Sequence, residues 1–233
     1  MVRTGLSVLQ DNMTPLTDGT VGLITNPSGV AADLTTTIDI MHDHPDVDLV
    51  RLLGPEHGIR GKAQAGEHVG DSTDDRTGLP VTSLYGETRR VDPEMVADID
   101  TVVYDMQDVG CRFYTYLYTL AYALEGVGQT DTDFVVLDRP NPVAPLGVDG
   151  KRVPPDEGSF VGDYRLPITH GLTVGELARY FNGEFDMGAT LSVVELDGWD
   201  RSMWYDDLDL PWVPPSPNIP TLDTATLYPG TCL

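Results

Sequence analysis

Short apolar segments recur along this chain of 233 residues, and the stretches between them are long enough to form helices. The segments are VGLIT (21–25), DLVRLL (48–53), TVVYDM (101–106) and FVVLD (134–138). Nearly continuous apolar runs that are rich in β-branched residues are typical of strands buried on both faces. The alternation therefore predicts an α/β fold with a mainly parallel sheet, covered by helices and joined by right-handed crossovers.

The segments between these strands predict the connecting helices, at 32–43, 93–99 and 113–126. We expect a further helix at 173–182, because Thr173 is followed three residues later by Glu176, which is the spacing of a capping box. Helices in these positions supply the crossovers that parallel strands require.

The composition changes near the C-terminus, where residues 211–229 hold six of the 18 prolines. Proline at this density favours extended, irregular backbone. We therefore expect one α/β domain over 1–210, followed by a Pro-rich extended tail over 211–233 that wraps the domain surface or lines a cleft.

Acidic residues dominate the charge, with 37 Asp and Glu against 14 Lys and Arg and a formal net charge of -23. They are scattered along the whole chain, which predicts a strongly anionic folded surface and not a disordered acidic arm. Such a lysine-poor, aspartate-rich composition resembles that of proteins from salt-loving archaea. It argues against nucleic acid as a partner, because phosphate binding depends on a basic face.

The N-terminal residues turn polar at once, and no apolar run approaches the ~20 residues needed to cross a bilayer. We therefore expect a soluble cytoplasmic protein with no membrane partner. The two cysteines, Cys111 and Cys232, fit neither a disulfide framework nor a zinc spacing, which predicts two free thiols.

Polar residues gather where each predicted strand ends. In open parallel sheets, ligands bind beyond the carboxyl ends of the strands. In chain order, the candidates are Asn26 and Ser28, then Glu56, His57 and Arg60, then Asp105, Gln107, Asp108 and Arg112, then Asp138, Arg139 and Asn141. The four strand ends therefore predict one polar site along one edge of the sheet.

Two of these clusters also have a purely structural interpretation. The residues from Asp138 to Pro142 fit an Asx turn with a surface ion pair. Asp105 and Asp108 fit the caps of the helix that begins near Phe113. Both interpretations stay open beside the functional one.

The remaining candidates differ in how easily structure alone explains them. Tyr114 lies in an aromatic helical segment where core packing is the default, although stacking on a sugar is the alternative. His68 and His170 are lone histidines that fit ordinary polar positions. Glu56 is harder to explain, because a structural turn does not need a carboxylate between a proline and a histidine.

Several chemistries lack their sequence signatures. There is no G-x-S-x-G motif and no G-x-x-x-x-G-K-[ST] loop, and EGVGQT at 125–130 lacks the spacing of a dinucleotide fingerprint. Glu56, His57 and His68 do not form a recognised metal-ligand spacing. We therefore predict no cofactor and no metal, and acid-base chemistry by carboxylates is what remains.

Long motifs resemble the exo-β-N-acetylmuramidase family, long catalogued as a domain of unknown function. They are GPEHGIRGKAQAGEHVGD, TGLPVTSLYGETRR, DMQDVGCRFYTYLYTLAYALE, VVLDRPNPV, SFVGDYRLPITHGLTVGELARYFN and PPSPNIPTLDTATLYPGTCL, and together they span nearly the whole chain. The resemblance implies a glycosidase that removes terminal N-acetylmuramic acid from peptidoglycan fragments. It also implies a Rossmann-like domain and a smaller C-terminal domain with the active site between them, and Glu56 as the leading catalytic carboxylate.

Glycosidase chemistry then assigns roles to the carboxylates. One protonated carboxyl assists the leaving group, and a second carboxylate attacks the sugar or activates water. We expect Glu56 to be the acid, and Asp105 or Asp108 to be the base or nucleophile. In an alternative mechanism, the 2-acetamido group of the sugar is the nucleophile and the aspartate only orients it.

The lactyl carboxylate of muramic acid requires a cation at the site. Arginine suits this role, because its planar fork holds a carboxylate through two hydrogen bonds. We expect Arg112 or Arg139 to fill it, with Arg60 third, while the alternative is that these arginines neutralise neighbouring aspartates. The other predicted substrate-binding residues are Asn26, His57, Gln107, Tyr114, Asn141, His170 and Asn218.

Members of this family usually continue well past the P-G-T-C motif, whereas this chain stops at Leu233. We therefore expect the C-terminal second domain to be largely absent and a separately encoded domain to be a candidate partner. The alternatives to an active glycosidase are a sugar-binding relative without turnover and a purely structural domain. A small carbohydrate is the expected ligand in the first two cases.

Overall fold

The computed structural model describes residues 1–56, 58–60, 72–84, 90–154, 157–159 and 161–232. Its strands form a seven-stranded sheet in the order β3-β4-β2-β1-β5-β6-β7, with β3 antiparallel to β4 and all other pairs parallel. The strands are β1 (Thr20–Thr25), β2 (Asp48–Gly54), β3 (Ser72–Thr73), β4 (Pro80–Ser83), β5 (Thr101–Asp105), β6 (Asp133–Leu137) and β7 (Thr190–Val194). The predicted α/β class with a mainly parallel sheet is confirmed.

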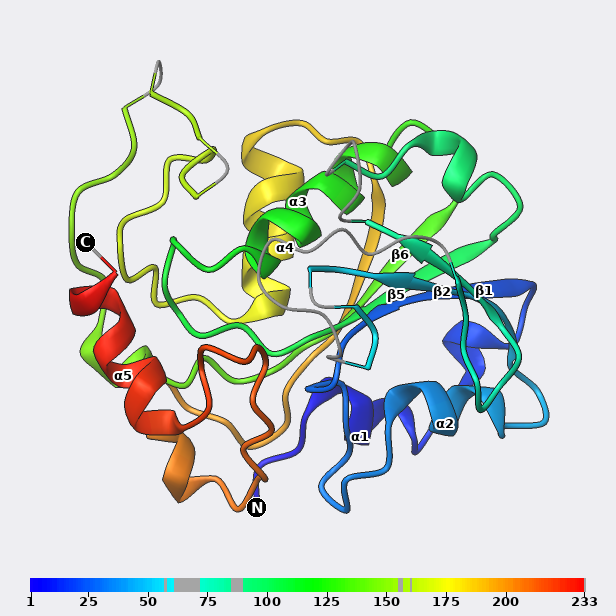
Figure 1. The fold of residues 1–233 in the computed structure, drawn as a ribbon, viewed down its shortest axis with the longest axis horizontal. Coiled ribbons are helices and arrows are strands. Elements are labelled where there is room, and N and C mark those ends of the chain that lie inside the picture. Colours follow the sequence, from blue (N-terminus) through cyan, green and yellow to red (C-terminus); the bar gives the residue numbers. More distant parts are fainter. Residues whose placement is uncertain (57, 61–71, 85–89, 155–156, 160, 233) are drawn as a thin grey trace.

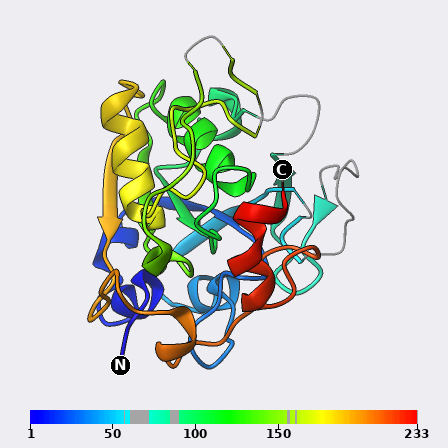
Figure 2. The same ribbon diagram turned by 90° about the vertical axis from the view of Figure 1, so that its left-hand side faces the viewer.

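Helices cover both faces of the sheet (Figures 1 and 2). One face carries α1 (Gly5–Leu9) and α2 (Thr37–His42), and the other carries α3 (Tyr116–Val127) and α4 (Val174–Glu184). The side chains of β5 alternate between the two cores, so Val103 packs on the side of α1 and α2 while Val102 and Tyr104 pack on the side of α3 and α4. Burial on both faces explains why the predicted strands are so uniformly apolar.

Side-chain caps determine where the helices begin, and these starts differ in part from those that the apolar pattern predicted. The capping box of Thr173 and Glu176 is confirmed at the start of α4. The helix predicted at 32–43 begins only at Thr37, since Leu34 adopts a left-handed conformation with φ of 70° and Thr36 caps the helix. The segment 93–99 forms only the short 3-10 turn η2 (Pro93–Met95), because the chain must soon enter β5.

The tail over 211–233 was predicted to be extended, but part of it is helical. Residues 222–231 form helix α5 (Leu222–Thr231), which Thr221 caps by accepting a hydrogen bond from the backbone N–H of Thr224. Pro229 lies in the last turn of α5, where the backbone donor that proline lacks is one of the last of the helix. The irregular backbone is confined to the segment before this helix, which includes Ser216 and its neighbouring prolines.

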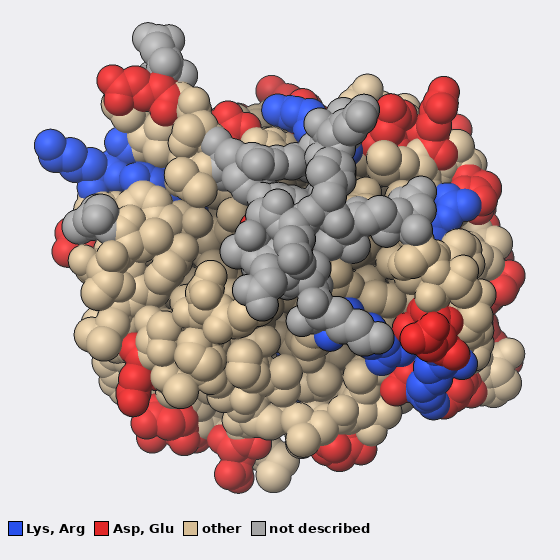
Figure 3. Space-filling model, in the orientation of Figure 1, with Lys and Arg blue, Asp and Glu red and all other residues tan. Residues whose placement is uncertain are grey.

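The described residues include no helix long and apolar enough to span a bilayer. Cys111 is buried, Cys232 is exposed, and both are free thiols, as predicted. Burial raises the pKa of Cys111 to about 12, so it is protonated at neutral pH. Figure 3 shows acidic side chains along the lower and right margins of one face, while a group of basic side chains lies at its upper left, over the loops between η3 (Ala144–Leu146) and α4.

Candidate active site

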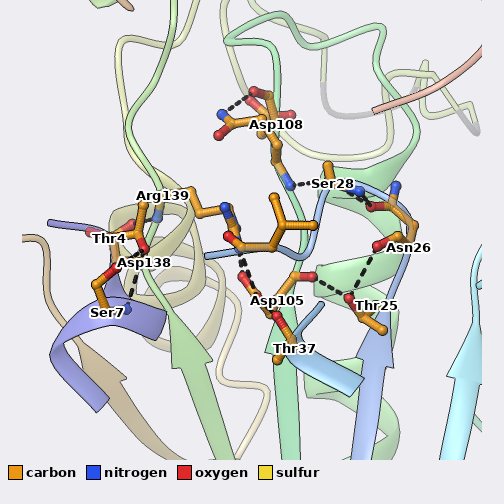
Figure 4. A network of polar contacts seen from close by, with 12 residues as sticks. Thr4, Ser7, Thr25, Asn26, Ser28, Thr37, Asp105, Asp108, Asp138 and Arg139 are labelled. Carbon is orange, nitrogen blue, oxygen red and sulfur yellow. Dashed lines mark hydrogen bonds and ion pairs between the residues drawn. The ribbon is translucent and has the colours of Figure 1, made fainter. Parts of the chain in front are cut away.

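Polar side chains from β1 and β5 meet at the carboxyl edge of the sheet (Figure 4). The Asn26 side-chain oxygen accepts hydrogen bonds from the backbone N–H and the hydroxyl of Ser28, at 3.0 and 2.6 Å. The Ser28 hydroxyl in turn accepts from the backbone N–H of Gln107 at 2.9 Å. Asn26 and Ser28 are both 2% exposed, so they join two strand ends and do not face a ligand.

Asp105 and Arg139 form a buried ion pair beside this junction. Arg139 donates to both Asp105 carboxylate oxygens, from Nε at 2.5 Å and from Nη2 at 2.9 Å, and the Thr37 hydroxyl donates to the same carboxylate. Burial alone would lower the pKa of Arg139, but the charge and hydrogen bonds of Asp105 raise it, so Arg139 stays charged. The predicted catalytic role of Asp105 and substrate-binding role of Arg139 do not fit this geometry, because each neutralises the other inside the protein.

Asp138 ties the end of β6 to the start of α4. Its carboxylate accepts from the backbone N–H of Arg139 and Gly175, at 2.9 and 2.8 Å, and from the Thr173 hydroxyl at 3.0 Å. Burial outweighs these hydrogen bonds and raises the pKa of Asp138 to about 6. These are not the bonds of an Asx turn at Asp138, since none goes to the N–H two residues on, and the adjoining ion pair of Arg139 with Asp105 is buried and not at the surface.

Glu56 follows β2 and is half-buried. Its Oε2 accepts from the Thr115 hydroxyl at 2.9 Å, while Oε1 has no hydrogen-bond partner among the residues that the structure describes. The Tyr116 hydroxyl lies 3.3 Å from the Glu56 backbone oxygen and donates to it. The neighbouring His57 lies outside the described residues. Glu56 is thus held through one carboxylate oxygen and the backbone, while the other carboxylate oxygen has no partner among the described residues.

The irregular part of the tail packs against this glutamate cluster. The backbone oxygen of Pro215 accepts from the Asn26 side-chain amide at 3.0 Å and from the Tyr116 hydroxyl at 2.9 Å. The Tyr114 hydroxyl is buried beside Ser216 without a hydrogen bond of good geometry. Asn218, predicted to bind substrate, is exposed in the turn that follows.

Asp108 pairs with His170 further along the same edge. Asp108 Oδ2 accepts from the backbone N–H of Gly110 at 2.7 Å and lies 3.2 Å from His170 Nε2. The backbone N–H of Leu172 donates to His170 Nδ1 at 3.2 Å, whereas the buried His170 Nε2 makes no hydrogen bond of good geometry with the described residues. Asp108 does not cap α3, whose N-cap is Thr115.

Two buried oxygens near this pair accept no hydrogen bond from the described residues. They are Asp108 Oδ1 and Gln107 Oε1. The Gln107 amide nitrogen, in contrast, donates to the backbone oxygens of Asp108 and Pro140, both at 2.7 Å. A buried acceptor left unpaired costs about 1 to 3 kcal/mol, so these two oxygens call for a donor such as a water molecule or a ligand.

The other predicted binding residues are committed to the protein itself. Arg60 pairs with Asp74 through two contacts of 2.9 Å, which, against the opposing effect of burial, lowers the pKa of Asp74 to about 2. Arg112 Nη1 donates to the backbone oxygens of Lys151 and Leu166, at 2.5 and 2.8 Å. Asn141 accepts from the backbone N–H of Val143 and donates to the backbone oxygen of Leu172. Within the described ranges, no three His, Cys, Asp or Glu side chains are grouped to hold a metal ion.

The site residues that sequence reasoning missed are those that orient Glu56. Thr115 and Tyr116 lie at the start of α3, in the same aromatic segment as Tyr114, for which core packing was the default interpretation. Tyr116 is indeed 1% exposed, yet its hydroxyl reaches Glu56 and the tail. The sequence signal for them was Thr115, a polar residue directly before an aromatic helix. This pattern is too common to identify a site.

The mainly parallel sheet, with helices on both faces and polar side chains at its carboxyl edge, defines an α/β protein. The chain belongs to the family described as "Exo-beta-N-acetylmuramidase NamZ, N-terminal", whose model matches residues 21–223. It is 48% identical, over all 233 residues, to the peptidoglycan beta-N-acetylmuramidase NamZ of Bacillus subtilis (strain 168), of which it covers 56%. The resemblance inferred from the motifs is therefore confirmed at the level of the family.

Two solved structures of DUF1343 family proteins from Bacteroides fragilis NCTC 9343 share the fold. The first has a TM-score of 0.91 and 46% identity, covering 97% of this chain and 58% of the other. The second has a TM-score of 0.85 and 30% identity, covering 100% of this chain and 61% of the other. The chain thus spans a little over half the length of the relatives that it matches.

Proposed function

We propose that this chain carries the catalytic edge of a glycosidase that releases terminal N-acetylmuramic acid, or a related 2-acetamido sugar, from peptidoglycan fragments. The name of the Bacillus subtilis relative supports the substrate class. The observation that carries the proposal is Glu56, whose Oε2 is held by Thr115 while Oε1 is left for a ligand. A general acid needs this arrangement, since one oxygen must be fixed while the other delivers a proton to the leaving group.

Asp108 is the second carboxylate of the proposed mechanism. Its Oδ2 is fixed by the backbone of Gly110 and faces His170, whereas its Oδ1 is buried without a partner among the described residues. Asp108 then activates water or orients the 2-acetamido group of the sugar during attack on the anomeric carbon. Asp105 no longer competes for this role, because Arg139 and Thr37 occupy its oxygens.

Substitution of Glu56 by Gln tests the proposal, because the amide keeps the shape and loses the acidic proton. We expect hydrolysis of a chromogenic N-acetylmuramide to fall by at least ~10² while the free energy of unfolding stays nearly constant. Glu94→Gln, at an exposed glutamate of η2, is the matched control and should hydrolyse at the wild-type rate.

Three results would change the assignment. Wild-type hydrolysis by Glu56→Gln would remove Glu56 as the acid. A fall of hydrolysis in Glu94→Gln of the same size would point to a general effect of charge. Binding of N-acetylmuramic acid by the wild-type chain without any hydrolysis would favour the alternative function, a sugar-binding relative without turnover.

A further inference from the structure

A second concave site is lined in part by His170. It is a pocket of about 370 Å³ between the loops at 148–152 and 165–172 and the C-terminal half of α4. Val148, Leu166 and Leu172 supply apolar walls, and Arg152 and Arg165 supply two cations. Apolar walls with a few convergent polar groups are the usual composition of a small-molecule site.

Arg152 and Arg165 differ from the other arginines of the described residues. Eight arginines there form ion pairs with Asp or Glu, and Arg112 donates to backbone oxygens. Neither Arg152 nor Arg165 makes an ion pair or a hydrogen bond with the described part of the protein. In a chain with 37 acidic residues and 14 basic ones, two arginines that form no ion pair with a described carboxylate are a marked exception.

Arg152, Arg165 and Tyr180 line the same pocket. Burial and the carboxylate of Glu184 raise the pKa of Tyr180, whereas Arg152 and Arg165 both lower it. The Tyr180 hydroxyl has no hydrogen-bond partner among the described residues. Together the three side chains offer two charged donors and one neutral donor to a ligand in this pocket.

The backbone that carries these arginines is held in place. Arg112 Nη1 donates to the backbone oxygens of Lys151 and Leu166, which directly adjoin Arg152 and Arg165 in the chain. The two loops are also joined by reciprocal backbone hydrogen bonds between Asp149 and Thr169, at 3.2 and 3.0 Å. A ligand therefore has to order only the arginine side chains, which reduces the entropy lost on binding.

We propose that this pocket binds a carboxylate-bearing ligand. Arg152 and Arg165 hold the carboxylate, the Tyr180 hydroxyl donates to it, and the apolar walls contact the carbon skeleton next to it. A monoanion fits better than a doubly charged phosphate, because Glu184 and the C-terminal half of α4 both add negative potential to the pocket. Binding here requires no contribution from Glu56.

The carboxylate could belong to the lactyl group of an amino sugar or to the end of a peptide, and calorimetric titration separates the two. N-acetylmuramic acid tests the first source and N-acetyl-D-alanine the second, while N-acetylglucosamine lacks the carboxylate and inorganic phosphate tests the rival anion. We expect at least one of the two carboxylates to bind more tightly than N-acetylglucosamine and phosphate.

Arg152→Ala and Arg165→Ala should each weaken that carboxylate by roughly tenfold to a hundredfold, since a charge-assisted hydrogen-bonded pair is lost. The neutral sugar should be unaffected. Arg179→Ala is the matched control. Arg179 is exposed, as Arg152 and Arg165 are, but it lies on α4 and pairs with Glu195 outside the pocket. Glu56→Gln should leave this binding unchanged, which separates the pocket from the proposed catalytic site.

The proposal is overturned if neither carboxylate binds, if phosphate binds more tightly, or if the two alanine variants bind the carboxylate as the wild type does. Equal losses of the carboxylate and N-acetylglucosamine in these variants would also overturn it, because they would show a general disturbance of the loops. Since both arginines are exposed, far-UV circular dichroism of each variant should match that of the wild type.

Discussion

The carboxyl edge of the sheet holds two kinds of polar cluster. In the first, which we call the closed network, the carboxylates of Asp105 and Asp138 and the side-chain amide of Asn26 have all found partners within the protein. In the second, the open cluster, Glu56 Oε1 and Asp108 Oδ1 have no partner among the described residues. Both clusters follow strand ends, so their position does not distinguish them.

The difference between the clusters shows that partners, and not location or residue type, separate structural from functional polar groups. A buried polar group with a full set of hydrogen bonds stabilises the folded state modestly. Removing one partner costs much more stability, because the other group is then left buried and unpaired. A buried oxygen without a donor costs stability until a ligand or water supplies one. The closed network should therefore respond to mutation through stability, and the open cluster through binding and activity.

Removing one charge of the closed network should give the largest loss of stability. We expect Asp105→Ala to lower the free energy of unfolding by about 3 to 5 kcal/mol, because it leaves Arg139 buried and unpaired. Asp105→Ala combined with Arg139→Met should recover a large part of this loss. Urea unfolding of the single and double variants gives the coupling free energy.

The pair of Arg51 and Asp98 is a matched control for that experiment. It also has two contacts, both of 2.8 Å, but the Asp98 side chain is 65% exposed. Asp98→Ala should therefore cost no more than ~1 kcal/mol. If Asp105→Ala costs no more than Asp98→Ala, the closed network does not stabilise the fold.

The protonation of Asp138 should produce a smaller, pH-dependent effect. Its pKa is about 6 in the folded protein, against the ordinary aspartate value of 3.8 that applies to the unfolded chain, so the folded state holds the proton more tightly. The contribution of Asp138 to stability is thus fully present below about pH 4 and is lost as the pH rises through about 6. The difference amounts to about 3 kcal/mol.

Asp138→Asn removes this titration while keeping acceptors for the backbone N–H groups of Arg139 and Gly175. Relative to the wild type, the variant should gain stability between about pH 4 and pH 7, by an amount close to that difference. Urea unfolding at both pH values measures it. The same pH dependence in the two proteins would show that Asp138 does not have a raised pKa.

Two neighbouring tyrosines should give the smallest contrast. Tyr116→Phe loses hydrogen bonds to Pro215 and Glu56, and we expect it to cost about 1 kcal/mol. Tyr114→Phe loses no well-formed hydrogen bond and should change stability by less than ~0.5 kcal/mol. Thermal unfolding of both variants tests the order, and a larger loss for Tyr114→Phe would place Tyr114 in the closed network.

The fold could be predicted from the sequence where burial left a clear pattern. The strands at 21–25, 48–53, 101–106 and 134–138 were predicted because both of their faces are buried, which makes them continuously apolar. The edge strand β7 was missed, since its residues are only half-buried or exposed and its pattern is weak. Helix α5 was missed because Pro229 and the prolines before the helix favoured extended backbone, while Thr221 supplies a cap.

The site could be predicted only as a region. Strand ends located Glu56 and Asp108 correctly at the carboxyl edge, but the sequence does not say which charges meet each other. Arg60 and Arg139 were expected to bind substrate, yet each has a carboxylate partner far away in the sequence, Asp74 and Asp105 respectively. Arg152 and Arg165, which form no ion pair with the described residues, lie in a loop region where no strand end marks a site.

The Pro215 backbone oxygen joins the C-terminal tail to two much earlier segments. Its donors are the Asn26 side-chain amide, after β1, and the Tyr116 hydroxyl, at the start of α3. Because a domain folds as a unit, these donors find their acceptor only when the segment around residue 215 is present. A truncation before Pro215 would therefore leave both donors without this acceptor beside Glu56.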